Sequence, residues 1–329
     1  MTAPWLQTQL EALLAQRGHA WLLSGPSGLG QYNLALDLAR AWLCERPAPG
    51  GACGSCASCH AVDVRTHADL CVLMPETTLL ERGWPLAEKA QADIDDKKRK
   101  ASREIRIDAL RDAIEFCQRS DARGRGKAVL IFPAERMNHV SANALLKTLE
   151  EPYGDVRFVL ASEAAHQLLP TIRSRCMAHA MVWPEADAAR DWLGTQGVAA
   201  AQAPSLLRAA GGRPDDALAY LHSGRDPQAW AALPLAMASG EPGLVRDWTP
   251  AQLLDALHKL CHDMLAKAVD AAPRYFAPAD LPVAAGLAAL TRWSRALRSA
   301  SRNAEHPFNA GLMLEALVSE AQNALNSGP

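Results

Sequence analysis

The chain has 329 residues, 49% of them hydrophobic, and a formal net charge of −2. This length and composition allow two or three domains with real cores and argue against wholesale disorder. The lack of a basic excess argues against strong nucleic-acid binding by the chain alone. The sequence has no signal-peptide pattern and no apolar run of membrane-spanning length, so we expect a cytoplasmic protein that does not contact a membrane.

The first part of the chain alternates short apolar runs with helical periodicity, which predicts one doubly wound α/β domain over residues 1–180. Helices are expected at 4–18, 31–43, 105–119, 141–149 and 168–175. Strands are expected at 19–23, 69–74, 128–132 and 157–161. The segment 75–104 is irregular and then heavily charged, which predicts an exposed insertion. Its basic run could touch DNA, although a solvated loop is favoured.

No strand pattern remains after residue 185, and the rest of the chain predicts helices. Those at 185–196, 203–210 and 214–222 suit a small helical lid over residues 181–224. A glycine and a proline predict a linker at 224–227. Apolar stripes then predict helices at 250–269, 284–299 and 309–325, which suit an all-helical domain over residues 225–329.

A glycine-rich turn follows the first expected strand and precedes a helix, as a phosphate loop does. A working loop reads G-x-x-x-x-G-K-[ST]; its backbone N–H groups cradle phosphate, its lysine neutralises charge and its hydroxyl holds magnesium. Gly25 and Gly30 stand at the glycine positions with Gly28 between them, but Gln31 and Tyr32 replace the last two residues. We therefore expect no bound ATP. An ordinary glycine-rich turn, or weak anion binding in the backbone nest, stays open.

The third expected strand of a nucleotide hydrolase of this class ends in an acidic pair, one carboxylate for magnesium and one for water. Counting back from Asn143–Lys147 places that pair at Phe132 and Pro133. Glu135 and Glu163 are near in sequence, but neither has a companion at metal-binding spacing. The sequence thus predicts that this chain does not hydrolyse ATP.

Four cysteines form a separate module over residues 44–60: Cys44, Cys53, Cys56 and Cys59. Close C-x2-C pairs direct two sulfurs to one ion, and four thiolates complete a tetrahedral shell, so we expect a structural zinc site. Free thiols, a redox dithiol, replacement of one thiolate by His60 and an iron–sulfur centre stay open as alternatives. The apolar periodic positions of three other cysteines place them in the expected core: Cys71, Cys117 and Cys261.

Together these features resemble the bacterial clamp-loader subunits of the AAA+ superfamily. The resemblance rests on the glycine loop, the cysteine insert, the helix motif Asn143–Pro152 and the triplet Ser174-Arg175-Cys176, which occur in this order. It implies an AAA+ domain with a RecA-like parallel sheet and a zinc module, then a small lid and a C-terminal helical collar. Within the family, a degraded loop beside a retained zinc module and triplet is typical of a subunit that does not hydrolyse ATP.

The resemblance assigns Arg175 the role of an arginine finger that acts on the ATP site of a neighbouring gamma/tau subunit; a solvated arginine is the alternative. Ser174 and Cys176 complete its motif. The family's lid pattern, G-x-x-R-x-A-L, starts at residue 212 and places Asp215 where a nucleotide-sensing arginine is expected, with Arg213 offset from it.

The implied function is that of a structural member of a hetero-pentamer with gamma/tau and delta subunits, which loads a sliding clamp onto primed DNA for DNA polymerase III. Contacts of this chain with the clamp and the DNA would be indirect, and the polymerase reaction would belong to other subunits. Two alternatives stay open: an AAA+ ATPase that binds nucleotide through an unusual loop, and a zinc-containing adaptor unrelated to replication.

Overall fold

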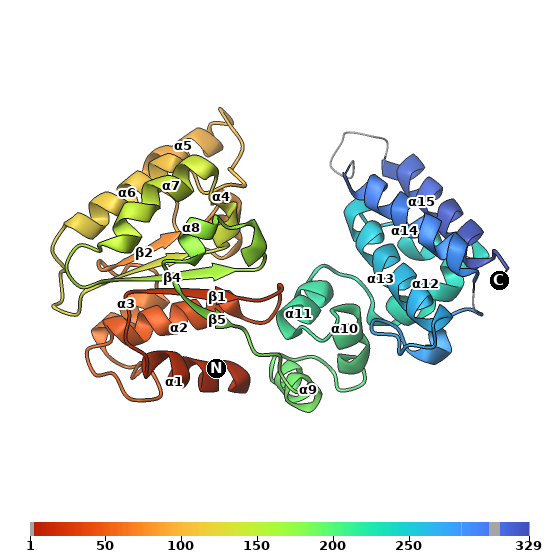
Figure 1. The fold of residues 1–329 in the computed structure, drawn as a ribbon, viewed down its shortest axis with the longest axis horizontal. Coiled ribbons are helices and arrows are strands. Elements are labelled where there is room, and N and C mark those ends of the chain that lie inside the picture. Colours follow the sequence, from red (N-terminus) through yellow and green to blue (C-terminus); the bar gives the residue numbers. More distant parts are fainter. Residues whose placement is uncertain (1–2, 284, 303–309, 329) are drawn as a thin grey trace. The chain divides into compact units, whose positions relative to one another are not determined.

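A computed structural model of the chain describes residues 3–283, 285–302 and 310–328 (Figure 1). The chain forms two compact units, Met1–Pro184 and Glu185–Pro329. No helix in the described ranges is long and apolar enough to span a membrane. Positions 284 and 309, where two of the predicted helices begin, lie outside the described residues.

The first unit is built on a parallel sheet whose five strands, within the described residues, run in the order β2-β3-β4-β1-β5. The strands are β1 (Ala20–Ser24), β2 (Leu70–Leu73), β3 (Lys127–Ile131), β4 (Val156–Ser162) and β5 (Met177–Ala180). The three central strands are almost entirely buried, because helices cover both faces of the sheet. The predicted α/β fold with a parallel sheet is confirmed.

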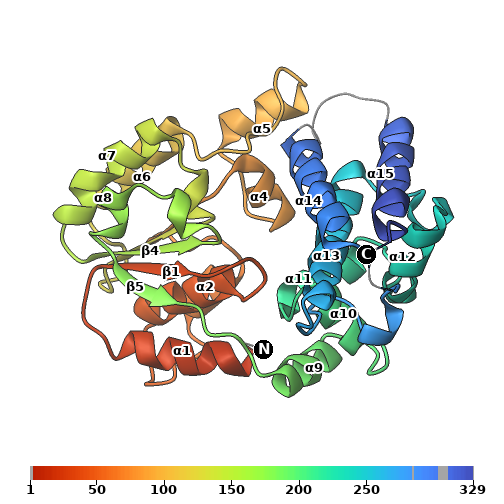
Figure 2. The ribbon, with the colours of Figure 1, turned by 45° about the vertical axis from the view of Figure 1, so that its right-hand side comes forward.

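Two layers of helices enclose this sheet (Figures 1 and 2). Helices α1 (Pro4–Leu14) and α2 (Gln31–Leu43) lie on one face, and α6 (Ile107–Gln118) and α7 (His139–Glu150) lie on the other. Helix α1 is shorter than predicted, since it ends before the glycine at position 18, a poor helix former.

Strand β5 is not predicted by the sequence, which indicates a helix over 168–175 and no strand after it. The structure instead has a short helix, α8 (Pro170–Arg173), followed by β5 at the edge of the sheet beside β1. The prediction is wrong here because β5 is mostly exposed and contains no β-branched residue, so it lacks the apolar run of a central strand.

The insertion at residues 75–104 also differs from its prediction as an irregular exposed segment. It contains two helices, α4 (Glu76–Glu81) and α5 (Glu88–Asp95), neither of which has a fully buried residue. Neither helix has the long apolar stripe that marks a helix in a sequence, which explains the error.

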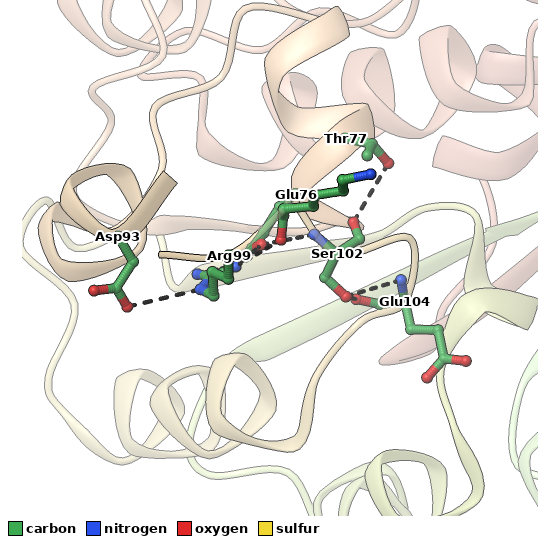
Figure 3. Close-up of polar contacts among 7 residues, drawn as sticks. Glu76, Thr77, Asp93, Arg99, Ser102 and Glu104 are labelled. Atoms are coloured by element: carbon green, nitrogen blue, oxygen red, sulfur yellow. Dashed lines mark hydrogen bonds and ion pairs between the residues drawn. The ribbon is translucent and has the colours of Figure 1, made fainter. Parts of the chain in front are cut away.

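An ion pair holds the insertion together (Figure 3). The guanidinium of Arg99 donates to both carboxylate oxygens of Glu76, at 2.5 and 2.8 Å, and its Nε lies 3.7 Å from Asp93. The N–H of Ser102 donates to the same carboxylate at 2.8 Å. These bonds tie the start of α4 to the segment after α5, so the charged run is partly a structural link rather than a wholly solvated loop.

The second unit consists of helices around one apolar core. They are α9 (Ala186–Thr195), α10 (Ala203–Ala209), α11 (Pro214–His222), α12 (Pro227–Ser239), α13 (Pro250–Ala268), α14 (Leu287–Arg302) and α15 (Ala310–Leu325). Leu206 and Trp230, from the predicted lid and collar, belong to the same core. The predicted boundary between the lid and the collar at residue 224 stays a prediction. The predicted linker is shorter than expected, because Asp226 caps α12 by accepting the N–H of Gln228 at 2.8 Å.

The substitution Glu76→Gln should loosen the insertion, because a neutral amide cannot pair with both donors of Arg99. A loss of about 1 kcal/mol of local stability corresponds to about fivefold faster amide hydrogen exchange in and after α5. The matched control is Glu88→Gln at the exposed start of α5, which should leave exchange unchanged.

The same exchange measurement has a pH dependence. The hydrogen bonds from Arg99 hold the pKa of Glu76 below its ordinary value. The carboxylate therefore stabilises the insertion above the unfolded pKa of about 4.3, and this contribution is lost as the pH falls through the lower folded value. Protection of the wild type and of Glu76→Gln should converge at acid pH. Equal protection at neutral pH would contradict the proposed link.

Candidate functional site

The predicted phosphate loop lies between the end of β1 and the start of α2. Gly28 and Gly30 have φ angles of 76° and 90°, which favour glycine, and Gly30 caps α2. A Cβ atom on Gly30 would lie 2.7 Å from the side chain of Leu6 of α1, so a larger residue there would force that side chain to move. The structure thus contains the strand, the glycine turn and the helix of a phosphate loop.

Gln31 stands where a working loop has its lysine. Its side chain is 2% exposed, and its Nε2 donates to the backbone oxygens of Gly25 and Pro26, at 2.9 and 2.6 Å. The side-chain amide of Gln31 therefore binds two backbone carbonyl groups of the same glycine loop and closes it. It carries no charge with which to neutralise phosphate.

Tyr32 stands where the magnesium-binding hydroxyl residue is expected, and Phe132 at the first position of the expected acidic pair. The structure brings the two rings together, with centroids 5.5 Å apart. Tyr32 is 8% exposed and its hydroxyl accepts a hydrogen bond from the indole N–H of Trp84 at 2.7 Å. An aromatic contact thus occupies the two positions that would hold magnesium.

The insertion also covers this aromatic pair, a role that sequence reasoning missed. The guanidinium of Arg82 lies 4.1 Å from the ring centroid of Tyr32 and 5.0 Å from that of Phe132. Arg82 and Trp84 directly follow α4. The one available signal was a tryptophan in an otherwise polar and charged segment, since such a large aromatic side chain is usually packed.

Glu135, an acid near the expected metal position, has a structural contact instead. Its carboxylate accepts from the hydroxyl of Ser162 at 2.7 Å and from the N–H of Glu163 at 3.1 Å. It thereby links the segment after β3 to the end of β4. The other acid named by the sequence, Glu163, contributes its backbone to this link.

The structure brings together the sulfur atoms of all four module cysteines, with every pair within 4.8 Å. Cys44 follows α2, Cys53 and Cys56 lie in the glycine-rich loop, and Cys59 lies in a helix that sequence reasoning did not predict, α3 (Ala57–Asp63). The Sγ of Cys44 lies 3.9 Å from that of Cys56 and 3.7 Å from that of Cys59. A tetrahedral zinc site with bonds of about 2.3 Å has sulfur atoms about 3.8 Å apart, so the cluster fits such an ion.

Backbone N–H groups donate to two of the sulfurs. The N–H of Cys53 donates to the Sγ of Cys44 at 3.3 Å, and that of Cys59 to the Sγ of Cys56 at 3.4 Å. Hydrogen bonding from the N–H of Ser55 lowers the pKa of Cys53 to about 5, whereas burial raises the pKa of Cys59 to about 12. His60 is exposed and outside the cluster.

The remaining predicted core cysteines are packed as expected. Cys117 and Cys261 are 3% and 2% exposed, and Cys71 packs against the core of the first unit. Burial raises the pKa values of Cys71, Cys117 and Cys261 to about 12, 11 and 11. These thiols are therefore neutral at physiological pH and act as small apolar side chains.

The triplet Ser174-Arg175-Cys176 joins α8 to β5, away from the glycine loop in the chain. The side chain of Arg175 is 30% exposed and forms an ion pair with Glu150, the last residue of α7. Cys176 packs against the core, and burial raises its pKa to about 11. The triplet therefore has an anchored residue beside a partly exposed guanidinium.

In the second unit, Asp215 lies in the first turn of α11. Arg213, which precedes that helix, donates from its Nε to Asp216 at 2.7 Å. The absence of a nucleotide-sensing arginine at this family position stays a prediction.

The parallel sheet with a glycine loop after its first strand, followed in the chain by a helical unit, is an AAA+ fold. A solved DNA polymerase III gamma subunit-related protein from Thermotoga maritima has a similar fold, with a TM-score of 0.51 and 17% identity, covering 98% of this chain and 100% of that one. The similarity in fold covers residues of both units.

The sequence comparisons give the family. A family model described as DNA polymerase III, delta subunit, matches residues 5–182. The delta' subunit of DNA polymerase III from Pseudomonas aeruginosa is 41% identical over 192 residues, 58% of this chain and 52% of that protein. The delta' subunit from Escherichia coli is 33% identical over 251 residues, 74% of this chain and 67% of that protein.

The chain belongs to the family of DNA polymerase III delta-prime subunits. The match spans about half the length of the Pseudomonas relative. The family assignment leaves no ground for the alternative of a zinc adaptor unrelated to replication.

The closed loop predicts that a labelled ATP analogue will not bind the isolated chain in a magnesium-dependent way. The substitution Gln31→Lys alone should not create such binding, because Tyr32 and Phe132 still occupy the magnesium positions. Equilibrium titration of both proteins with the analogue, with and without magnesium, checks this. Tight magnesium-dependent binding to the wild type would favour the ATPase alternative.

Proposed function

We propose that the chain is a non-hydrolysing structural member of the DNA polymerase III clamp loader. The contact of Tyr32 with Phe132 carries this proposal, because it fills the positions that would bind magnesium with aromatic rings. The closure of the glycine loop by Gln31 adds to it. Without the loop lysine, a serine or threonine hydroxyl, or an acidic pair, the site lacks the groups that stabilise phosphoryl transfer in a working phosphate loop.

We further propose that the chain acts on a nucleotide held by its neighbour. Arg175 would serve as an arginine finger at the ATP site of an adjacent gamma/tau subunit. A guanidinium supplied across an interface neutralises the charge that develops on the transferred phosphoryl group. The partial exposure of Arg175 beside the anchored Cys176 supports this role.

The proposed assembly is a hetero-pentamer with gamma/tau and delta subunits that opens a sliding clamp and places it on primed DNA. The helical second unit would contribute the collar that holds the subunits together, with residues 181–224 as a lid. Polymerase activity would reside in other subunits of the holoenzyme.

We also propose that the four-cysteine cluster holds a structural zinc ion. The ligands would be Cys44, Cys53, Cys56 and Cys59, whose sulfurs have the spacing of a tetrahedral site. Bound zinc would join the end of α2 to α3 and would leave no coordination position for water. A short glycine-rich segment gains from such a link, because it cannot bury a core of its own.

The metal proposal predicts about one zinc ion per chain by elemental analysis of the purified protein. Cys56→Ser should remove the ion and lower the melting temperature, because it takes away one of four ligands. His60→Ala is the matched control and should retain the ion. A fully folded protein that contains no metal, or iron in place of zinc, would contradict the zinc assignment.

The finger proposal is tested in a loader reconstituted with gamma/tau and delta subunits. Arg175→Ala should leave assembly intact and lower the DNA-stimulated ATPase kcat by about tenfold or more, since an arginine finger contributes on the order of a thousandfold at the site it serves. Arg173→Ala, an exposed arginine at the end of α8, should have no effect. Unchanged turnover with Arg175→Ala would remove the finger.

A further inference from the structure

Arg175 leaves a backbone that is fixed on both sides. The hydroxyl of Ser174 donates to the carbonyl oxygen of Thr171 at 3.1 Å, and the N–H of Arg175 donates to that of Ile172 at 3.1 Å. On the other side, Cys176 packs against the core before β5 begins. The guanidinium therefore extends from a rigid junction, and its direction is decided by its own side-chain contacts.

Those contacts hold the guanidinium along one side. Its Nε donates to Oε1 of Glu150 at 2.6 Å, and its Nη2 donates to the same oxygen. Its Nη1 donates to the carbonyl oxygen of Thr171 at 2.8 Å. Three of the five guanidinium N–H groups are thus engaged. Among the described residues, no further hydrogen bond of Arg175 is found, and two N–H groups stay available for an external anion.

Local stability does not explain why residue 150 is a glutamate. It is the last residue of α7, where the helix dipole disfavours a negative charge. Its ion pair with Arg175 is partly exposed, with side-chain exposures of 47% for Glu150 and 30% for Arg175, and ion pairs near the surface contribute little to stability. Orientation of the guanidinium is therefore a better account of this contact than stabilisation of the fold.

We propose that Glu150 is the positioning residue of the arginine finger. It holds Arg175 from the Nε side, with the Thr171 carbonyl as a second support, so that the two remaining N–H groups are presented together to a phosphoryl group of a neighbouring subunit. This inference rests on the proposed finger role of Arg175. A pre-oriented guanidinium loses less conformational freedom when it contacts the transferring group, which raises the rate of that step.

The test uses the reconstituted loader and its DNA-stimulated ATPase. Glu150→Gln should lower kcat by about threefold to fivefold and leave the KM for ATP unchanged, because the finger of the proposal contacts the transferring phosphoryl group in the transition state rather than the bound ground-state nucleotide. Glu150→Ala, which removes every acceptor, should lower kcat further. Glu151→Gln is the matched control: it changes an adjacent exposed acid that, among the described residues, forms no hydrogen bond or ion pair with Arg175, and kcat should not change.

A double substitution separates positioning from a general structural effect. If Glu150 acts through Arg175, then Glu150→Gln combined with Arg175→Ala should be no slower than Arg175→Ala alone. Additive losses would overturn the inference. So would a normal or raised kcat for Glu150→Gln in a loader where Arg175→Ala is slow, and in that case the finger itself would stand. If Arg175→Ala is not slow, the proposed function fails and this inference fails with it.

Discussion

The packing of Tyr32 against Phe132 is the contact on which the functional interpretation of this domain depends. In a hydrolysing relative of this fold, the same two positions would face each other across a magnesium ion, with a hydroxyl on one side and a carboxylate on the other. Here they form an aromatic contact that Arg82 and Trp84 cover. The contact leaves the α/β fold unchanged, because aromatic packing at the carboxyl edge of the sheet takes the place of the polar magnesium-binding groups.

The domain lacks the metal-binding groups of a working phosphate loop, but it has a second chemical feature, the guanidinium of Arg175. Arg175 belongs to the junction of α8 and β5, and its contacts are with Glu150 and Thr171. Its geometry therefore does not depend on the glycine loop. A domain of this kind can keep a rigid sheet and a directed guanidinium although its glycine loop lacks the lysine of a working phosphate loop, and the proposed action on a neighbour requires this arrangement.

Two polar segments of the domain depend on local links more than on cores of their own. The proposed zinc ion would fix the glycine-rich segment after α2, and the pair of Glu76 with Arg99 fixes the insertion after β2. Segments this short bury too little apolar surface to offset their conformational entropy, so covalent, metal or charge-assisted links are the usual solution. The insertion in turn supplies the residues that cover Tyr32.

The sequence by itself determined the features that depend on local spacing: the alternating α/β elements, the degraded glycine loop, and the cysteine pattern. Hydrophobic periodicity and the spacing of particular residues are properties of the sequence, so they can be recognised before the structure is known. Only the tertiary structure decided the edge strand β5, the contact of Tyr32 with Phe132, and the pairing of Arg175 with Glu150. These depend on how distant segments meet, and a linear pattern of residue types does not specify which exposed strand pairs or which charged side chains come into contact.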